Sequence, residues 1–248
     1  SQHLAVREIS LAEPLHWLVL GWRDFVRCPG PGLLHGFALT MFGAALMAVA
    51  HDRFWLLAGA FSGFLLMGPL AATGLYALSR ALERGEPATM GTALRTWIPK
   101  DHRLVLFGVL LSPAGTGWVL TSAALITSLA DGAVRNPVDF IRHVVLSERS
   151  WLFEAWLALG GAMAAPVYAS SVVSIPLLLD RPIGVLGAVL TSWRCVLANP
   201  VPLALWGALL MALAGLGLVT GFGLVVVVPW LAHASWHAYR ALVAPQRS

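Results

Sequence analysis

Two histidines in the stretch "LAHASWHAYR" have a spacing that metal sites use on helices. His233 and His237 are four residues apart, so on a helix they share one face and could hold a metal ion or a haem iron together with a third group. Trp236 and Tyr239 beside them are typical of a membrane interface, where a histidine needs no ligand. The pair is therefore a candidate metal site, but we favour a structural role and expect no cofactor.

Ionisable side chains inside the apolar stretches are few, and each is a candidate for function because a charge in a membrane is costly. Glu154 lies one turn into one stretch, and Asp180 and Arg181 end that stretch. We expect Asp180 and Arg181 to form a boundary pair with each other or with Arg23 or Arg194. A pump or redox carrier would show buried carboxylates or paired histidines at mid-depth, so their absence favours a protein that is not an enzyme.

The composition is that of a membrane protein. Of 248 residues, 58% are hydrophobic and only 11% are charged, against about 25% in globular proteins, and the mean hydropathy is +0.77. Stretches long enough to cross a bilayer as a helix need roughly 17 to 25 apolar residues. Six are near or above that length: 33–50, 54–79, 104–130, 151–179, 202–220 and 221–243.

These runs are continuous rather than alternating, which excludes a membrane barrel and predicts an all-α, polytopic bundle of six transmembrane helices. The last two stretches are separated only by "GLGLVTGFG". The glycines there allow a tight turn, but five spans with one broken helix remain an alternative. No soluble domain is evident, so residues 1–248 form one integral membrane domain.

The distribution of lysine and arginine predicts the orientation. The N-terminal segment, the connections 80–103 and 180–194 and the C-terminal segment hold twelve of these residues, and the opposite connections hold four. Both termini are therefore expected in the cytoplasm. The pI of about 9.7 then reflects contact with anionic lipid head groups rather than a nucleic-acid surface.

One short pattern occurs twice, in "GWRDFVRCPGPGLL" and "SWRCVLANPVPLAL". A gapless comparison pairs Trp22 with Trp193, Arg23 with Arg194, Pro29 with Pro200 and Pro31 with Pro202. Proline cannot continue a helix but suits its first turn, so each copy predicts an amphipathic interfacial helix that stops where a membrane helix begins. Tryptophan and arginine before that boundary suit the head-group layer.

The spans also repeat as pairs. "GPLAATGLYALSR" and "VPWLAHASWHAYR" match at Pro69 and Pro229 and at Arg80 and Arg240. We expect three units, at about 10–80, 85–179 and 180–243, each an interfacial helix followed by a hairpin. Such parallel repeats occur in transporters.

Two further segments carry predictions. Val138, Ile141, Val144 and Val145 would share one face of an interfacial helix in the outer connection 131–150. The span 151–179 holds Pro166 and Pro176 among small residues. It predicts either a discontinuous helix that lines a substrate cavity or, as we favour, a kinked and tightly packed helix.

Five ordered stretches, "GWRDF", "GPLAATGLYALSRALERGE", "SIPLLLDR", "TSWRCVLANPVPLALWGALL" and "PWLAHASWHAYRALV", extend over essentially the whole chain. They resemble a prokaryotic family of predicted integral membrane proteins described as a domain of unknown function, some members of which carry a cytochrome c oxidase subunit label. That label implies a subunit of a respiratory oxidase. Since the chain lacks the mid-membrane histidines of a haem-copper subunit, the resemblance implies a non-catalytic partner.

We therefore expect a six-span protein of the bacterial inner membrane that is a non-catalytic accessory or assembly subunit of a membrane complex. Its partners would be membrane lipids and respiratory subunits, with no nucleic acid. One alternative is a small-molecule or lipid transporter, which the repeated hairpins favour. The other is a metal- or haem-binding protein through His233 and His237.

Overall fold

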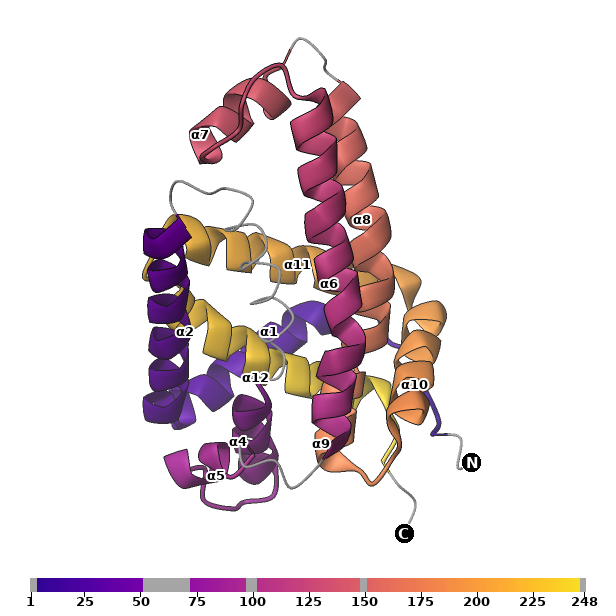
Figure 1. The fold of residues 1–248 in the computed structure, drawn as a ribbon. Coiled ribbons are helices and arrows are strands. Elements are labelled where there is room, and N and C mark those ends of the chain that lie inside the picture. The colour runs from indigo at the N-terminus through magenta and orange to yellow at the C-terminus, as the bar shows by residue number, and fades with distance from the viewer. Residues whose placement is uncertain (1–3, 51–71, 97–101, 148–150, 246–248) are drawn as a thin grey trace. The chain divides into compact units, whose positions relative to one another are not determined.

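The structure, a computed structural model, describes residues 4–50, 72–96, 102–147 and 151–245. These residues are helical except for connections and one isolated bridge between Val6 and Val243, which confirms the all-α fold class. In chain order the helices are α1 Glu13–Arg27, α2 Pro29–Ala50, α4 Thr73–Glu83, α5 Met90–Leu94, α6 His102–Leu129, α7 Pro137–Phe140, the π-helix η1 Ile141–Val145, α8 Trp151–Ser171, α9 Ser174–Asp180, α10 Val185–Ala198, α11 Pro200–Val219 and α12 Leu224–Leu242 (Figure 1).

Within the described parts of the chain, three stretches of helix are long and apolar enough to cross a membrane: His102–Leu129, Trp151–Asp180 and Pro200–Val219. They coincide with the predicted spans 104–130, 151–179 and 202–220. Helices α2 and α12 occupy the predicted spans 33–50 and 221–243, while the predicted span 54–79 lies mostly outside the described residues. The count of six spans therefore stays a prediction.

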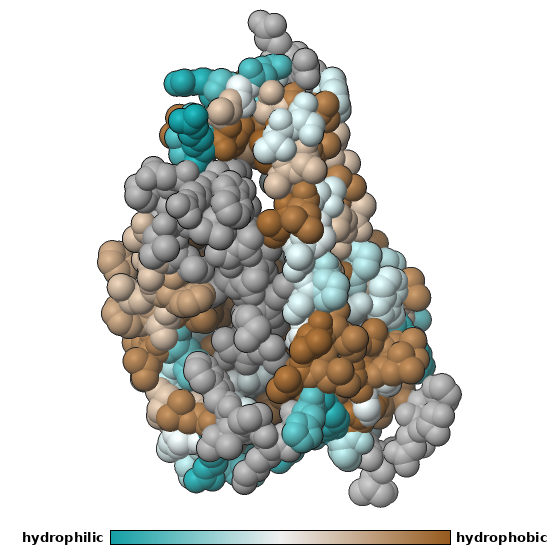
Figure 2. Space-filling model, in the orientation of Figure 1, coloured by the Kyte–Doolittle hydropathy of each residue, from teal (hydrophilic) through white to brown (hydrophobic). Residues whose placement is uncertain are grey.

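The long helices expose apolar side chains instead of burying them. Val109 and Leu110 on α6 are each 60% exposed, and Val219 at the end of α11 is 86% exposed. Figure 2 shows hydrophobic side chains over large areas of the described surface on one face. Such surfaces are unfavourable in water and are expected to contact lipid or another subunit.

Both predicted junctions between an interfacial and a membrane helix are helix boundaries. Helix α1 ends at Arg27 and α2 begins at Pro29, and α10 ends at Ala198 before α11 begins at Pro200. The residues between them have nearly the same backbone angles, φ −136° and ψ 62° at Cys28 and φ −132° and ψ 54° at Asn199. The two copies of the sequence pattern thus form the same local structure.

The two copies also turn equivalent faces outward. On both α1 and α10 the outward positions form a stripe of large apolar side chains. The inward positions are small or polar on α10, whereas on α1 they also include Trp17 and Phe25. The stripes are Leu15, Val19, Trp22 and Val26 on α1 and Leu186, Leu190, Trp193 and Leu197 on α10, which match position for position; Trp193 is half-buried and the others are exposed. An outward apolar stripe of this kind is compatible with a helix at a membrane interface, and the interfacial placement stays a prediction.

The helical stretch that begins at Trp151 is interrupted between α8 and α9. Pro176 has no N–H to offer to the carbonyl of Val172, four residues earlier, and α8 ends at Ser171 before α9 begins at Ser174. The Ser192 hydroxyl accepts the N–H of Val173 at 3.2 Å. The predicted kink thus takes the form of a short break between α8 and α9, and the choice between a cavity-lining helix and a tightly packed one stays a prediction.

The chain forms two compact units. In the unit that holds residues 108–167, α6 and α8 lie side by side (Figure 1), with the rings of Trp118 and Trp156 at 5.4 Å. The interfacial helix predicted in the connection 131–150 is short and consists of α7 and η1. Because the π-helix has a wider turn, Val144 is buried against Ile126 while Ile141 is half-exposed, so the predicted single apolar face is wrong.

The other unit, which holds residues 1–41, 69–107 and 168–248, has a cyclic packing order. Helix α5 packs on α4, α10 packs on α9, and α1 packs on α12, while α4, α9 and α12 contact one another. The first helix of each predicted repeat thus lies against the last helix of the preceding one, and α1 closes the ring on α12. Fully buried side chains fill the centre: Leu75, Leu78, Leu177, Leu178 and Trp236.

Candidate functional site: a buried His–Ser–Asp–His chain

Helices α1 and α12 approach closely because α1 has a glycine at the contact. A Cβ atom on Gly21 would lie 2.5 Å from the backbone nitrogen of Ala234, so only glycine allows this spacing. One turn further along each helix, Asp24 and His237 meet, with His237 Nε2 at 2.8 Å from Asp24 Oδ2. The close approach therefore places a carboxylate on α1 against an imidazole on α12.

Two more polar residues extend this pair into the unit. Ser79 on α4 donates its hydroxyl to Asp24 Oδ2 at 2.8 Å, and Ser79 Oγ lies 2.7 Å from Nδ1 of His233. Asp24, Ser79 and His233 are buried, with exposed fractions of 6%, 1% and 0%, and the His237 side chain is 20% exposed. The four side chains form a continuous hydrogen-bonded chain from a partly exposed histidine to a fully buried one.

The contacts determine which ring nitrogen of His233 carries the proton. The one hydroxyl proton of Ser79 goes to the Asp24 carboxylate, so Ser79 Oγ accepts from His233, and Nδ1 must be the donor. The lone pair is then on Nε2, which is buried and has no hydrogen-bond partner among the described residues. Leaving such a group unsatisfied costs about 1–3 kcal/mol, so the arrangement has a cost that packing alone does not explain.

The neighbouring groups respond to the charge on Asp24. Burial alone would raise the pKa of Asp24, but the hydrogen bonds from His237 and Ser79 and the nearby imidazoles outweigh it, and its pKa lies below the ordinary value. Burial, together with the charge of Asp24, raises the pKa of Cys28 to about 11. Asp24 is thus ionised at neutral pH, and Cys28 is a neutral thiol.

A histidine from a further helix lies near the buried end of the chain. His35 on α2 interacts electrostatically with His233, and its Nδ1 lies 2.8 Å from the carbonyl oxygen of Pro31. A carbonyl can only accept, so Nδ1 of His35 carries its proton too. From its place just inside the first predicted span, His35 is expected to face His233 and His237 if the ends of the bundle meet.

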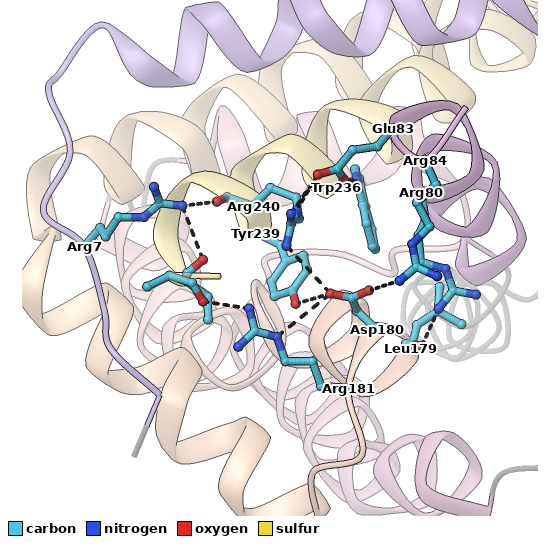
Figure 3. A network of polar contacts seen from close by, with 12 residues as sticks. Arg7, Arg80, Glu83, Arg84, Leu179, Asp180, Arg181, Trp236, Tyr239 and Arg240 are labelled. Atoms are coloured by element: carbon cyan, nitrogen blue, oxygen red, sulfur yellow. Dashed lines mark hydrogen bonds and ion pairs between the residues drawn. The ribbon is translucent and has the colours of Figure 1, made fainter. Parts of the chain in front are cut away.

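A second polar network joins the ends of three helices (Figure 3). Asp180 at the end of α9 accepts from the Tyr239 hydroxyl at 2.7 Å and pairs with Arg84 at 3.3 Å. Glu83 at the end of α4 pairs with Arg240 of α12 at 2.7 Å and accepts from Trp236 Nε1 at 3.1 Å. Each of α4, α9 and α12 is therefore linked by polar side chains to the other two.

The same network holds the two ends of the described chain together. Arg7 donates to the carbonyl oxygens of Arg240 and Val243, and Arg181 donates to that of Ala244 at 2.7 Å. The side chain of Asn199 accepts from the N–H of Ile9 at 2.9 Å. The segment before α1 is thereby fixed against both α12 and the junction of α10 with α11.

The predicted site residues are only partly in their expected places. Asp180 and Arg181 lie 3.9 Å apart as a weak pair, but the stronger partners of Asp180 are Arg84 and Tyr239 and not Arg23 or Arg194. Arg194 donates to the carbonyl oxygen of Leu4 at 3.3 Å instead. The expected pair of Asp180 with Arg181 is thus present, and Arg84 and Tyr239 are further partners of Asp180 that the sequence did not indicate.

The histidine pair has a different chemistry from the one that its spacing suggests. His237 Nε2 contacts Asp24, and His233 Nδ1 contacts Ser79, so each ring has a protein partner. In the described part of the chain, no group of three or more His, Cys, Asp or Glu side chains is arranged to hold a metal ion. Metal binding by His233 and His237 stays a prediction.

Asp24 and Ser79 are the residues that sequence reasoning missed. Asp24 stands between Arg23 and Phe25 in a segment that reads as a surface helix, and Ser79 stands at the end of an apolar stretch. The available signal was the repeat itself, because the position of Asp24 is that of Cys195, an apolar site in the other copy. A carboxylate at a position that is buried in both copies requires partners.

The helices and their exposed apolar faces define a helical integral membrane protein. The chain belongs to the family described as predicted integral membrane protein (DUF2189), whose sequence pattern matches residues 56–180, about half of the chain. No curated protein and no solved structure matches it. The family membership confirms the resemblance inferred from the sequence and the assignment to a membrane.

Proposed function

We propose that the protein is a six-span protein of the bacterial inner membrane with both termini in the cytoplasm. The proposal is supported by the excess of lysine and arginine in alternate connections, by the three helices of spanning length, and by the helical conformation of α2 and α12. Single cysteines at Arg135 and Arg194, in a background with Cys28 and Cys195 replaced by serine, test the orientation. In intact cells an impermeant maleimide should label position 135 and not position 194, and the reverse result would overturn the orientation.

Within that membrane we propose a non-catalytic accessory or assembly subunit of a larger complex of the respiratory type. The observation that carries this proposal is the exposure of the long helices. Only 11% of the most apolar window of α6 and 17% of that of α11 is buried inside the protein. In contrast, the polar side chains of each network bind other side chains of the same network. Chemistry on a bound substrate is thus less well supported than contact with lipid and neighbouring subunits.

Photo-crosslinking in native membranes tests the subunit role. A photoreactive amino acid at Leu120 of α6 or Met211 of α11, which are 66% and 74% exposed, should give a crosslink to one defined protein. The matched control is the same substitution at Leu203 of α11, which is fully buried and should give only internal products. Crosslinks to lipid alone at both exposed positions, together with a single species after purification in mild detergent, would overturn the proposal.

A transporter is the second candidate, supported by the cyclic order in which α5, α10 and α1 pack on α4, α9 and α12. Repeats of one orientation are a common basis of transport folds. The place where α4, α9 and α12 meet is filled by buried side chains such as Leu75 and Leu178, which supports this candidate less than the first. Uptake of a labelled solute by vesicles that contain the pure protein would favour transport.

A further inference from the structure

The Asp24 chain ends at a buried ring nitrogen of His233. His233 Nε2 is fully enclosed and unpartnered among the described residues, whereas its Nδ1 is held by Ser79 and, through Ser79, by Asp24. A group that holds one ring nitrogen of an imidazole fixes its tautomer and leaves the other nitrogen bare. Nε2 is thus the atom of His233 that can take up a proton.

We propose that His233, Ser79, Asp24 and His237 form a proton relay between the interior of the unit and its partly exposed edge. This function goes beyond the proposed subunit role and does not depend on it. The ligand of the relay is the proton, carried to Nε2 by water with an excess proton. The three contacts, of 2.7, 2.8 and 2.8 Å, are all within the range in which a proton passes between heavy atoms.

The transfer can be written with every proton accounted for. Hydronium gives its proton to His233 Nε2 and becomes water. The Nδ1 proton of His233 moves to Ser79 Oγ, and the hydroxyl proton of Ser79 moves to Asp24 Oδ2. The ring of His233 ends neutral with its proton on Nε2, the serine ends as a hydroxyl, and the carboxylate ends as a carboxylic acid. The net change is one proton added, and the hydrogen bonds between His233, Ser79 and Asp24 are reversed.

The proton leaves by way of His237. In the resting state His237 donates its Nε2 proton to the Asp24 carboxylate. Once His237 has exchanged protons with water, so that Nδ1 carries the proton and Nε2 is bare, Nε2 accepts the proton of Asp24 and water removes the one on Nδ1. The 20% exposure of the His237 side chain gives water this access, whereas hydronium reaches the fully buried His233 only when the packing around Nε2 opens. Asp24 returns to the carboxylate, and the chain accepts again once His233 has returned to the tautomer with a bare Nε2 and His237 to the one with its proton on Nδ1.

Other titratable groups lie on the helices around the relay. They are Cys28 at the junction of α1 and α2, His35 on α2, Tyr76 and Glu83 on α4, Arg240 on α12 and, further along, Asp180 on α9 through Tyr239, while α11 has none. Of these, His35 interacts electrostatically with His233. A His35→Gln variant therefore accompanies the test, because it removes this interaction and leaves the four relay residues in place.

The test is a coupled titration of the full chain in nanodiscs. Nitrogen-15 NMR of labelled histidine reports the tautomer of His233, assigned by its loss in His233→Gln, and infrared spectroscopy reports the carboxylic acid band of Asp24, assigned by its loss in Asp24→Asn. In the wild type and in His35→Gln, both signals should change at one shared midpoint. In Ser79→Ala the two midpoints should separate by at least about one pH unit, a tenfold change in proton affinity.

Two further variants keep the test decisive. Thr191→Ala removes another buried hydroxyl, which bonds only the carbonyl of Gly187 in its own helix, and should leave the shared midpoint unchanged. Ser79→Thr keeps the hydroxyl and should show the shared midpoint of the wild type. This outcome can be measured even if Ser79→Ala does not fold. Separate midpoints in the wild type, or a shared midpoint in a folded Ser79→Ala, would overturn the relay.

Discussion

Asp24 and Cys195 occupy the same position in the two copies of the helix junction, and both are buried, but only Asp24 carries a charge. Burial raises the pKa of Cys195 to about 12, so that thiol stays neutral. Asp24 is ionised because α12 and α4 supply His237 and Ser79 as donors. The two copies thus share a backbone and differ in chemistry, and the difference comes from the helices that each copy packs against.

Removing the charge of Asp24 should destabilise the contact of α1 with α12. Asp24→Asn keeps the shape but weakens two charge-assisted hydrogen bonds in a buried place, so the free energy of unfolding should fall by about 1–3 kcal/mol. Thermal unfolding in detergent measures the change. The control is Glu13→Gln, since Glu13 pairs with His16 at 3.7 Å in a partly exposed setting and should change stability by at most about 1 kcal/mol. Equal losses of unfolding free energy in both variants would show that Asp24 does not stabilise the contact of α1 with α12.

Acid should weaken the wild type more than the Asp24→Asn variant. The folded-state pKa of Asp24 is below its ordinary value of 3.8, so the unfolded chain binds the proton more readily. Asp24 therefore contributes stability above pH 3.8, and this contribution is lost as the pH falls through the folded-state pKa. Melting temperatures in acid should drop less steeply in Asp24→Asn, and parallel curves for the two proteins would contradict the lowered pKa.

Local features of the structure could be predicted where chemistry acts within a few residues. Proline at Pro29 and Pro200 breaks a helix whatever surrounds it, and the apolar runs 104–130 and 202–220 are helical because a continuous apolar run has few alternatives. The outward stripe of α1 follows from its amphipathic period. These inferences need no knowledge of what packs where.

The candidate site could not be predicted because its residues come from three separate segments. Asp24, Ser79 and His237 are brought together by the close approach at Gly21 and by the closure of α1 on α12. A one-dimensional pattern gives the face of a helix but not its neighbour, so Asp24 read as a surface charge. The same limit explains why Arg84 was not identified as the partner of Asp180.

The two thiols should react very slowly at neutral pH. Burial raises the pKa of Cys28 to about 11 and that of Cys195 to about 12, so at pH 8 only about one Cys28 in a thousand is a thiolate. A thiol reagent such as Ellman's should detect almost no free thiol in the folded protein and both cysteines after denaturation. Fast reaction of the folded protein would contradict the burial of both.

Asp24→Asn should increase the reactivity of Cys28 alone. The charge of Asp24 is one of the two causes that raise the pKa of Cys28, and it does not act on Cys195. Mass spectrometry after brief alkylation separates the two cysteines, so Cys195 is the internal control. An equal rise at both would indicate general loosening of the fold instead.

A methyl group at Gly21 should push α1 away from α12 and destabilise the protein without changing any of the four relay residues. The Cβ atom of Gly21→Ala would lie 2.5 Å from the nitrogen and 2.7 Å from the Cα atom of Ala234, and because both are backbone atoms, α1 must shift. Overpacking of this kind costs about 1–3 kcal/mol, which exceeds the gain of about 1 kcal/mol that alanine brings to a helix. Gly215→Ala on α11 is the matched control, since no atom lies within 4 Å of its Cβ position, and it should be neutral or stabilising. Thermal unfolding compares the two variants, and a Gly21→Ala protein as stable as Gly215→Ala would show that the α1–α12 contact is looser than in the structure.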